Sequence, residues 1–195
     1  MSTLYGSRAP GGRRGARRPR GRRGFSALEL LVALGILAIL AALGLPALLG
    51  LLERSRVNAG ASELVGALRR AQALAVSQGG FFRVHFGSDA NVGRPNSYRL
   101  ERNSGAGWPT PADTRATSPW VETEWVDLAG QYPGLTVGPP VDNAGNTLTW
   151  ITYNSRGAFV DPTGPVTPPA SIPVQNRSGT TRTVVAQYAR AARLQ

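Results

Sequence analysis

The feature that most restricts the fold of this chain is a run of 23 residues, 30–52, without a charged side chain. As an α-helix this run is about 35 Å long, which exceeds the roughly 30 Å hydrocarbon thickness of a bilayer. It is also longer than the apolar centre of a usual cleaved secretory signal, which is roughly 7–15 residues. The chain is therefore predicted to carry one membrane-spanning helix near its N-terminus. An ordinary single-pass anchor and an unusual signal peptide are the two alternatives.

Charge is distributed unevenly on the two sides of this run. Residues 1–24 contain eight arginines and no acidic residue, and they account for most of the net charge of +11. They are rich in glycine, proline and arginine, a composition typical of disorder. The positive-inside rule places this end in the cytoplasm and the rest of the chain outside it. A nucleic-acid-binding arm is the less favoured interpretation of the same arginines.

An amphipathic segment follows the uncharged run and a polar group at residues 53–56. Its small and apolar residues recur at steps of three and four, which predicts one buried helical stripe. The stripe consists of Val57, Ala61, Leu64, Leu68, Ala71 and Ala75. Gly79 and Gly80 are expected to end the helix. We expect one helix over roughly residues 26–78, kinked at Pro46 because proline removes a backbone hydrogen bond.

The residues beyond this helix are predicted to form a β-rich domain. Six segments alternate between apolar and polar side chains or are rich in β-branched residues: 81–86, 97–102, 121–126, 147–153, 171–175 and 182–188. Parallel strands would need long crossover helices, and none is evident. The predicted fold class is α+β, a long N-terminal helix packed against a small antiparallel sheet. The expected parts are a basic leader (1–24), the membrane-spanning half of the helix (25–52), its amphipathic half (53–79) and a β-rich globular domain (80–195).

The residue types give little support for catalysis. The chain has no cysteine, which excludes disulfides, thiolate nucleophiles and cysteine-ligated metals. His85 is the only histidine, so it has no second histidine with which to build a metal site, and we expect it to be exposed on a strand. Glu122 and Glu124 are either a carboxylate pair or two solvent-facing acids of an edge strand, and the second is favoured. We expect no enzymatic activity, no metal and no cofactor.

The residues at the start of the helix carry a family resemblance. Gly24, Phe25 and Glu29, preceded by basic residues and followed by a long apolar helix, resemble the processing site of type IV pilins and pseudopilins. The resemblance implies that a prepilin peptidase in the membrane cleaves after Gly24 and methylates the new amine of Phe25. Pro46 lies where the helix-kinking proline of that family usually lies. The N-terminus would be cytoplasmic and the C-terminal domain extracytoplasmic.

Glu29 is the single acid at the edge of the apolar helix. A carboxylate near the membrane interior is costly unless it is paired. The pilin resemblance implies that Glu29 pairs with the Phe25 amine of a neighbouring subunit and so orients that subunit during assembly. The alternative is an acid favoured at a helix N-terminus by the macrodipole, an effect of under about 1 kcal/mol at an exposed site.

Two further segments narrow the resemblance to a subfamily. Residues 67–86, where the amphipathic helix leads directly into an early strand, and residues 151–157 resemble minor pseudopilins. That group includes the H subunit of type II secretion and the FimT-type minor pilins. The resemblance implies a structural subunit at the inner membrane that helps to initiate or cap a filament. Its partners would be the prepilin peptidase and other pseudopilins or minor pilins.

The C-terminal tail is basic. After Asp161 there is no acid, and the remaining charged residues are Arg177, Arg182, Arg190 and Arg193. Some FimT-type relatives bind DNA through a basic C-terminal segment with a Gly-Arg element, but here alanine precedes Arg190. DNA capture during natural transformation is therefore the second functional hypothesis. We favour a solvated strand edge that charge protects from aggregation.

Overall fold

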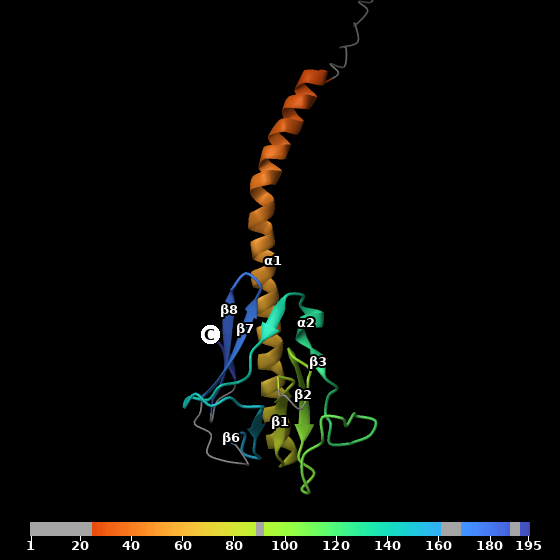
Figure 1. The fold of residues 1–195 in the computed structure, drawn as a ribbon, viewed down its shortest axis with the longest axis vertical. Helices are drawn as coiled ribbons and strands as arrows, with labels where there is room; N and C mark the ends of the chain where they lie inside the picture. The colour runs from red at the N-terminus through yellow and green to blue at the C-terminus, as the bar shows by residue number, and fades with distance from the viewer. Residues whose placement is uncertain (1–24, 89–91, 161–168, 188–191) are drawn as a thin grey trace, which may run out of the picture. The chain divides into compact units, whose positions relative to one another are not determined.

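The computed structural model describes residues 25–88, 92–160, 169–187 and 192–195. The chain divides into two compact units, residues up to Gly44 and Leu45–Gln195. Helix α1, Ala27–Gln78, is a single element of 52 residues that begins in the first unit and ends in the second (Figure 1). All described strands belong to the second unit. The fold class expected from the sequence, a long N-terminal helix with an antiparallel β domain, is confirmed.

Both ends of α1 are fixed by local hydrogen bonds. At the start, the Ser26 hydroxyl accepts a hydrogen bond from the backbone N–H of Glu29 at 3.2 Å, as an N-cap residue does. At the end, Gly79 takes a positive φ of 66°, and the Gly80 N–H donates to the Ala75 carbonyl at 3.2 Å. This is the Schellman arrangement, which glycine favours because it has no Cβ. The predicted helix bounds are therefore confirmed to within one residue.

The two halves of α1 differ completely in burial. Sixteen of the nineteen exposed large hydrophobic residues in the described chain lie within residues 25–52. The first buried residue of the helix is Val57, and all six positions of the predicted stripe are buried. Pro46 lies inside the helix, as expected; the kink stays a prediction. The sequence pattern thus separates a half that is exposed among the described residues from a half that packs on the β domain.

The β domain contains two antiparallel sheets instead of the single sheet that we expected. The first has the order β3-β2-β1-β5-β6, with β1 at Phe82–Phe86, β2 at Ser97–Arg102, β3 at Val126–Asp127, β5 at Trp150–Tyr153 and β6 at Phe159–Val160. The second has the order β4-β7-β8-β9, with β4 at Leu135–Val137, β7 at Ala170–Asn176, β8 at Thr181–Ala186 and β9 at Arg193–Leu194. A short helix, α2, spans Leu128–Gln131.

Five of the six predicted strand segments contain a strand. The exception is residues 121–126, where Val121 makes only an isolated bridge to Glu101 and Val126 alone enters β3. Strands β4, β6 and β9 were not predicted because two or three residues are too few to show an alternating pattern. These short strands pair with longer neighbours, so long-range contacts create them.

The hydrophobic core lies between α1 and the sheets. Phe82, Val84 and Phe86 point to one face of β1, and all three are buried. Their cluster also includes the α1 stripe and buried residues of β2, β5, β7 and β8. Polar contacts also reach α1, and in two of them the half-buried Glu63 accepts hydrogen bonds from the Tyr98 hydroxyl at 3.3 Å and the Tyr132 hydroxyl at 2.9 Å. Burial together with the Glu63 carboxylate raises the pKa of Tyr98.

Gly60 marks the closest approach of β4 to α1. A Cβ at this position would lie 2.5 Å from Cδ1 of Leu135, a side chain that is itself buried. Gly66, on the same helix, is exposed, and a Cβ there would meet no atom within 4 Å. The two glycines therefore have different roles, since only Gly60 provides space for a neighbouring element.

Alanine at these two positions should have opposite effects on stability. Gly66→Ala should raise the free energy of unfolding by about 0.8–1 kcal/mol, because alanine favours the helix. Gly60→Ala gains the same propensity but displaces Leu135, and such overpacking costs about 1–3 kcal/mol. We expect Gly60→Ala to be less stable than Gly66→Ala by at least about 1 kcal/mol. Urea unfolding of the full chain in neutral detergent, followed by tryptophan fluorescence, measures the difference. Equal stabilities would contradict the close approach.

Candidate functional site

The N-terminal residues singled out by the sequence lie at an open end of α1. Gly24 is outside the described residues, while Phe25 is 81% exposed and Glu29 is exposed in the first turn. Ser26 and Glu29 have the Ser-x-x-Glu spacing of a capping box, but only the backbone N–H of Glu29 is bonded to Ser26. The Glu29 carboxylate forms no hydrogen bond or ion pair with any described residue. It is therefore available to a cation from outside the chain.

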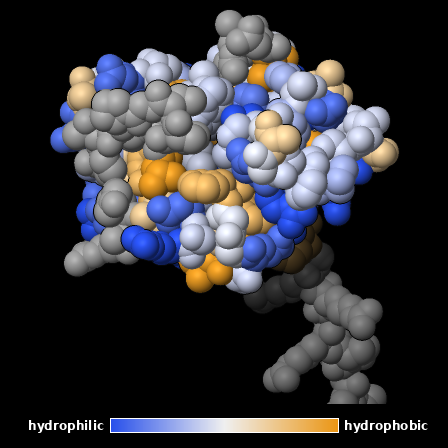
Figure 2. Space-filling view, turned by 90° about the horizontal axis from the view of Figure 1, so that it is seen from below, coloured by the Kyte–Doolittle hydropathy of each residue, from blue (hydrophilic) through white to orange (hydrophobic). Residues whose placement is uncertain are grey.

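Beyond Glu29, the helix surface formed by residues 30–52 is uncharged and exposes large hydrophobic side chains along its whole length. Within the described residues, α1 is the one helix long and apolar enough to cross a membrane by length and composition. The β domain differs: beyond residue 52, only Val76, Phe81 and Leu194 are exposed large hydrophobics among the described residues. Figure 2 shows a face of the domain that is mainly hydrophilic, with its hydrophobic residues in small groups. A large exposed apolar surface of this kind is typical of an interaction site or a membrane-embedded segment.

The tail arginines do not form one group. Arg177, in the turn after β7, and Arg182, on β8, both lie near α1: Arg177 lines a cavity with Arg56, and Arg182 Nε donates to Asn58 Oδ1 at 3.0 Å. Arg193 is on β9, where it is exposed and pairs in register with Val185. Arg190 lies outside the described residues. The DNA hypothesis treated these arginines as one basic tail, whereas Arg177 and Arg182 lie beside residues 56–58 of α1.

His85 corrects an expectation drawn from the sequence. It was predicted to be exposed on β1, but its exposed fraction is 2%. The alternation of β1 is as predicted, since Arg83 and His85 share the face opposite the core. However, that face is covered by the long connection between β2 and β3. Trp108 from this connection lies 4.4 Å from the Arg83 guanidinium, and Trp125 lies 4.7 Å from that of Arg99.

A fully buried carboxylate, Glu101, is the centre of this covered face. Glu101 accepts hydrogen bonds from Arg83, from Arg99 Nε at 2.5 Å and from His85 Nδ1 at 3.1 Å. Arg99 also donates to the carbonyl oxygens of Thr110 at 2.6 Å and Asp113 at 2.7 Å. Because Arg99 bonds both to the carboxylate and to the connection, the cluster attaches the connection to the sheet.

The electrostatics of Glu101 follow from this arrangement. Burial alone would raise the pKa of the Glu101 carboxyl, but the hydrogen bond from His85 and the charges of Arg83 and Arg99 hold the pKa below its usual value. The carboxylate is thus ionised and enclosed by the side chains that compensate its charge. This is a structural ion cluster, and the sequence reasoning missed it. The available signal was the placement of two arginines, a histidine and a glutamate on facing positions of two adjacent strands.

The other candidate acids, Glu122 and Glu124, do not form a carboxylate pair. Glu122 is half-buried, with Oε1 4.0 Å from Arg102 Nε. Glu124 is exposed and accepts a hydrogen bond from the Arg115 N–H at 2.8 Å. The expectation that both acids lie on an edge strand is wrong, because residues 122–125 are outside the strands. In the part of the chain that the structure describes, no group of three or more histidines or acids could hold a metal ion.

Replacing Glu101 should destabilise the fold in a pH-dependent manner. Glu101→Gln leaves Arg83 and Arg99 buried without their counter-charge, and breaking a buried ion pair in this way costs about 3–5 kcal/mol. A pKa lowered in the folded state contributes stability above the unfolded pKa of about 4.3, and this stability is lost as pH falls through the folded pKa. The stabilities of the wild type and the variant should therefore approach each other below about pH 4.

Urea unfolding of both proteins between pH 3 and pH 7 tests this expectation. Glu124→Gln, which alters an exposed acid, is the matched control and should stay within about 0.5 kcal/mol of the wild type. A pH-independent difference between the wild type and Glu101→Gln would show that the charge of Glu101 is not what stabilises the cluster.

No family model matches the chain, and no curated protein matches its sequence. Among solved structures, it is similar to the minor pseudopilin EpsH from the type 2 secretion system of Vibrio cholerae, with 14% identity over 72% of this chain and 96% of that chain, at a TM-score of 0.48. It is also similar to the type IV minor pilin FimU of Pseudomonas aeruginosa, with 18% identity over 73% of this chain and 90% of that chain, at a TM-score of 0.47. At these identities and TM-scores, neither likeness transfers a function to this chain.

Proposed function

We propose that this chain is a minor subunit of a type II secretion pseudopilus or a type IV pilus, with a structural role in starting or capping the filament. The observation that carries the proposal is the junction at Gly24 and Phe25, with Glu29 as the fifth residue after the cut. This junction lies at the head of an uninterrupted 52-residue helix. A membrane peptidase would remove residues 1–24, and residues 25–52 would hold the mature subunit in the cytoplasmic membrane.

The exposed surface of α1 supports assembly through this helix. Its first half presents leucine, isoleucine and valine on all sides and has no partner among the described residues. In the membrane these side chains contact lipid, and in a filament they contact the helices of neighbouring subunits. Both surroundings are apolar, so transfer from one to the other costs little hydrophobic free energy. Polar contacts then decide how the helices align.

Glu29 is the polar group that provides this alignment. Its carboxylate lies in the first turn of α1 and is not used within the described chain. Cleavage after Gly24 would create an amine on Phe25, the cation that an acid in a low-dielectric environment requires. Pairing between Glu29 of one subunit and the Phe25 amine of its neighbour would hold the two helices at a defined stagger. The β domain would then contact sister subunits outside the cytoplasm.

Processing at the junction is the first test. The mature protein should begin at Phe25 and carry a methyl group on its amine. N-terminal mass spectrometry of the protein, expressed with its prepilin peptidase, measures both features. A mature protein that begins at Met1, or at a residue beyond Ala42, would overturn the proposal. Gly24→Ala is the matched variant and should accumulate with residues 1–24 still attached.

Assembly through Glu29 is the second test. Glu29→Ala should be cleaved and inserted normally, but its cross-linking to partner subunits should fall by about tenfold or more, because the pairing cation loses its acid. Alkaline extraction of membranes measures insertion, and site-specific cross-linking measures assembly. Glu124→Ala, which removes an exposed acid of the β domain, is the control and should assemble normally. Normal assembly of Glu29→Ala would contradict the pairing role of Glu29 but not the proposed cleavage after Gly24.

A further inference from the structure

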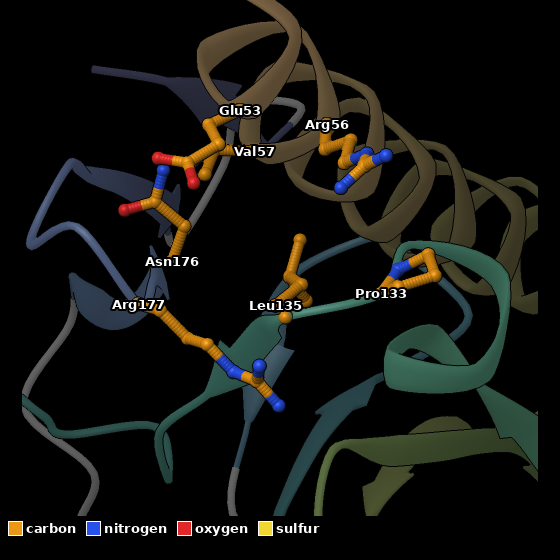
Figure 3. Close-up of a pocket in the computed structure, with 8 residues that line it drawn as sticks. Glu53, Arg56, Val57, Pro133, Leu135, Asn176 and Arg177 are labelled. Atoms are coloured by element: carbon orange, nitrogen blue, oxygen red, sulfur yellow. The ribbon is translucent and has the colours of Figure 1, made fainter. Parts of the chain in front are cut away.

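A cavity of about 200 Å³ lies where α1 meets the second sheet. Arg56 and Val57 of α1 line it on one side, and Arg177 lines it from the turn after β7. Figure 3 shows Leu135, from β4, between the two arginines, while Glu53 is turned toward Asn176. Val57 and Leu135 are buried, so they give the cavity an apolar floor beneath two cationic groups.

The two arginines of this cavity are not used by the fold. Both are exposed, and neither guanidinium forms a hydrogen bond or an ion pair with a residue that the structure describes. The arginines of the Glu101 cluster, by contrast, are buried and fully engaged. In addition, Nδ2 of Asn176, which also lines the cavity, is buried without a hydrogen-bond partner. The site therefore presents several unused donors and is suited to an anion.

The cavity lies just beyond the end of the uncharged run. Arg56 is four residues past Leu52, which corresponds to about 6 Å along the helix. Residues 45–52 belong to the same compact unit as the cavity, and their leucines are about half exposed or more. The headgroup region of a bilayer begins where its hydrocarbon ends and is only about 5–8 Å thick. A helix embedded as far as Leu52 therefore holds the cavity at the level of the lipid phosphates.

We infer that this cavity binds the phosphate group of an anionic phospholipid, with Arg56 and Arg177 as the phosphate ligands. Guanidinium groups bind phosphate oxygens through paired, charge-assisted hydrogen bonds. Two arginines, Arg56 and Arg177, and one acid, Glu53, are the charged residues that line the cavity. The apolar floor would accommodate the glycerol part of the lipid. The inference rests on the proposed function in one respect, the insertion of α1 into a bilayer.

This assignment gives one of the tail arginines, Arg177, a use other than DNA binding. The β7–β8 hairpin brings Arg177 and Arg182 beside residues 53–58 of α1, close to the end of the uncharged run. A bound lipid at this position would hold the β domain at a fixed height above the bilayer before the subunit enters a filament.

The test is a titration of the full chain, purified in a neutral detergent, with short-chain phosphatidylglycerol and phosphatidylcholine as probes. Thermophoresis of the labelled protein measures both affinities. The wild type should prefer phosphatidylglycerol by roughly thirtyfold, which corresponds to about 2 kcal/mol, one per arginine. Arg56→Gln with Arg177→Gln should abolish this preference. Arg94→Gln with Arg115→Gln, which removes the same charge at two exposed positions elsewhere, should keep it.

Three outcomes would overturn the inference. The first is a wild type that binds both lipids equally or a double variant that keeps the preference. The second is inorganic phosphate binding as tightly as phosphatidylglycerol, which would indicate a site for a free anion. The third is a DNA duplex that binds more tightly than the lipid and whose binding is lost in the same double variant. That result would indicate a nucleic-acid site. If the double variant does not fold, Arg177→Gln alone should still reduce the preference for phosphatidylglycerol by about fivefold.

The proposed function fails through a different measurement. Because the titration is done in detergent, it reports on the cavity even if α1 does not anchor the chain. Alkaline extraction of cell membranes reports on anchoring alone. A chain that is extracted with the soluble proteins would overturn the membrane-anchored subunit, whereas a chain that stays in the membrane without a lipid preference would overturn only the lipid site.

Discussion

The structure depends on the burial of one stripe of α1 against two sheets. Leu64 and Leu68 are completely buried in this stripe, and each contributes about 1.5–3 kcal/mol relative to an exposed side chain. The stripe also contains three alanines, which let the sheets approach closely. Gly60, next to Ala61, likewise leaves space for Leu135. Buried residues of both sheets belong to one hydrophobic cluster with this stripe, so the helix is part of the core that the sheets share.

The same helix requires two different surroundings, and this requirement connects the fold to the proposed function. Residues 30–52 are uncharged on every side, whereas residues beyond Leu52 bury only one face. The change occurs within one turn, at Glu53, Arg54 and Arg56. Charged groups at this point would fix how deeply the helix enters a bilayer, because moving them into the hydrocarbon is costly. In the proposed function, filament assembly would act on a helix whose depth these charges define.

The first sheet has a hydrophobic face toward α1 and a charged face that is nevertheless buried. On this face Arg83, Arg99 and His85 bond to Glu101 instead of to water. Because the tryptophans of the β2–β3 connection lie over these arginines, a long segment with little regular structure is held in one position. A buried ion cluster is a weak source of net stability, but it requires this connection to take one arrangement.

The sequence alone determined the features that depend on local signals. The bounds of α1 follow from the uncharged run, the helical periodicity after it and the Gly79–Gly80 terminus, and strands β1 and β2 follow from alternation. Alternation also separated the two faces of β1. It contains no information that the β2–β3 connection, through Trp108 and Trp125, covers the face of His85. Only the tertiary structure decided that burial, the division into two sheets and the meeting of Arg182 with Asn58 across 124 residues. The physical reason is that periodicity records which side chains share a face, whereas the contacts of that face are made by chain segments distant in sequence.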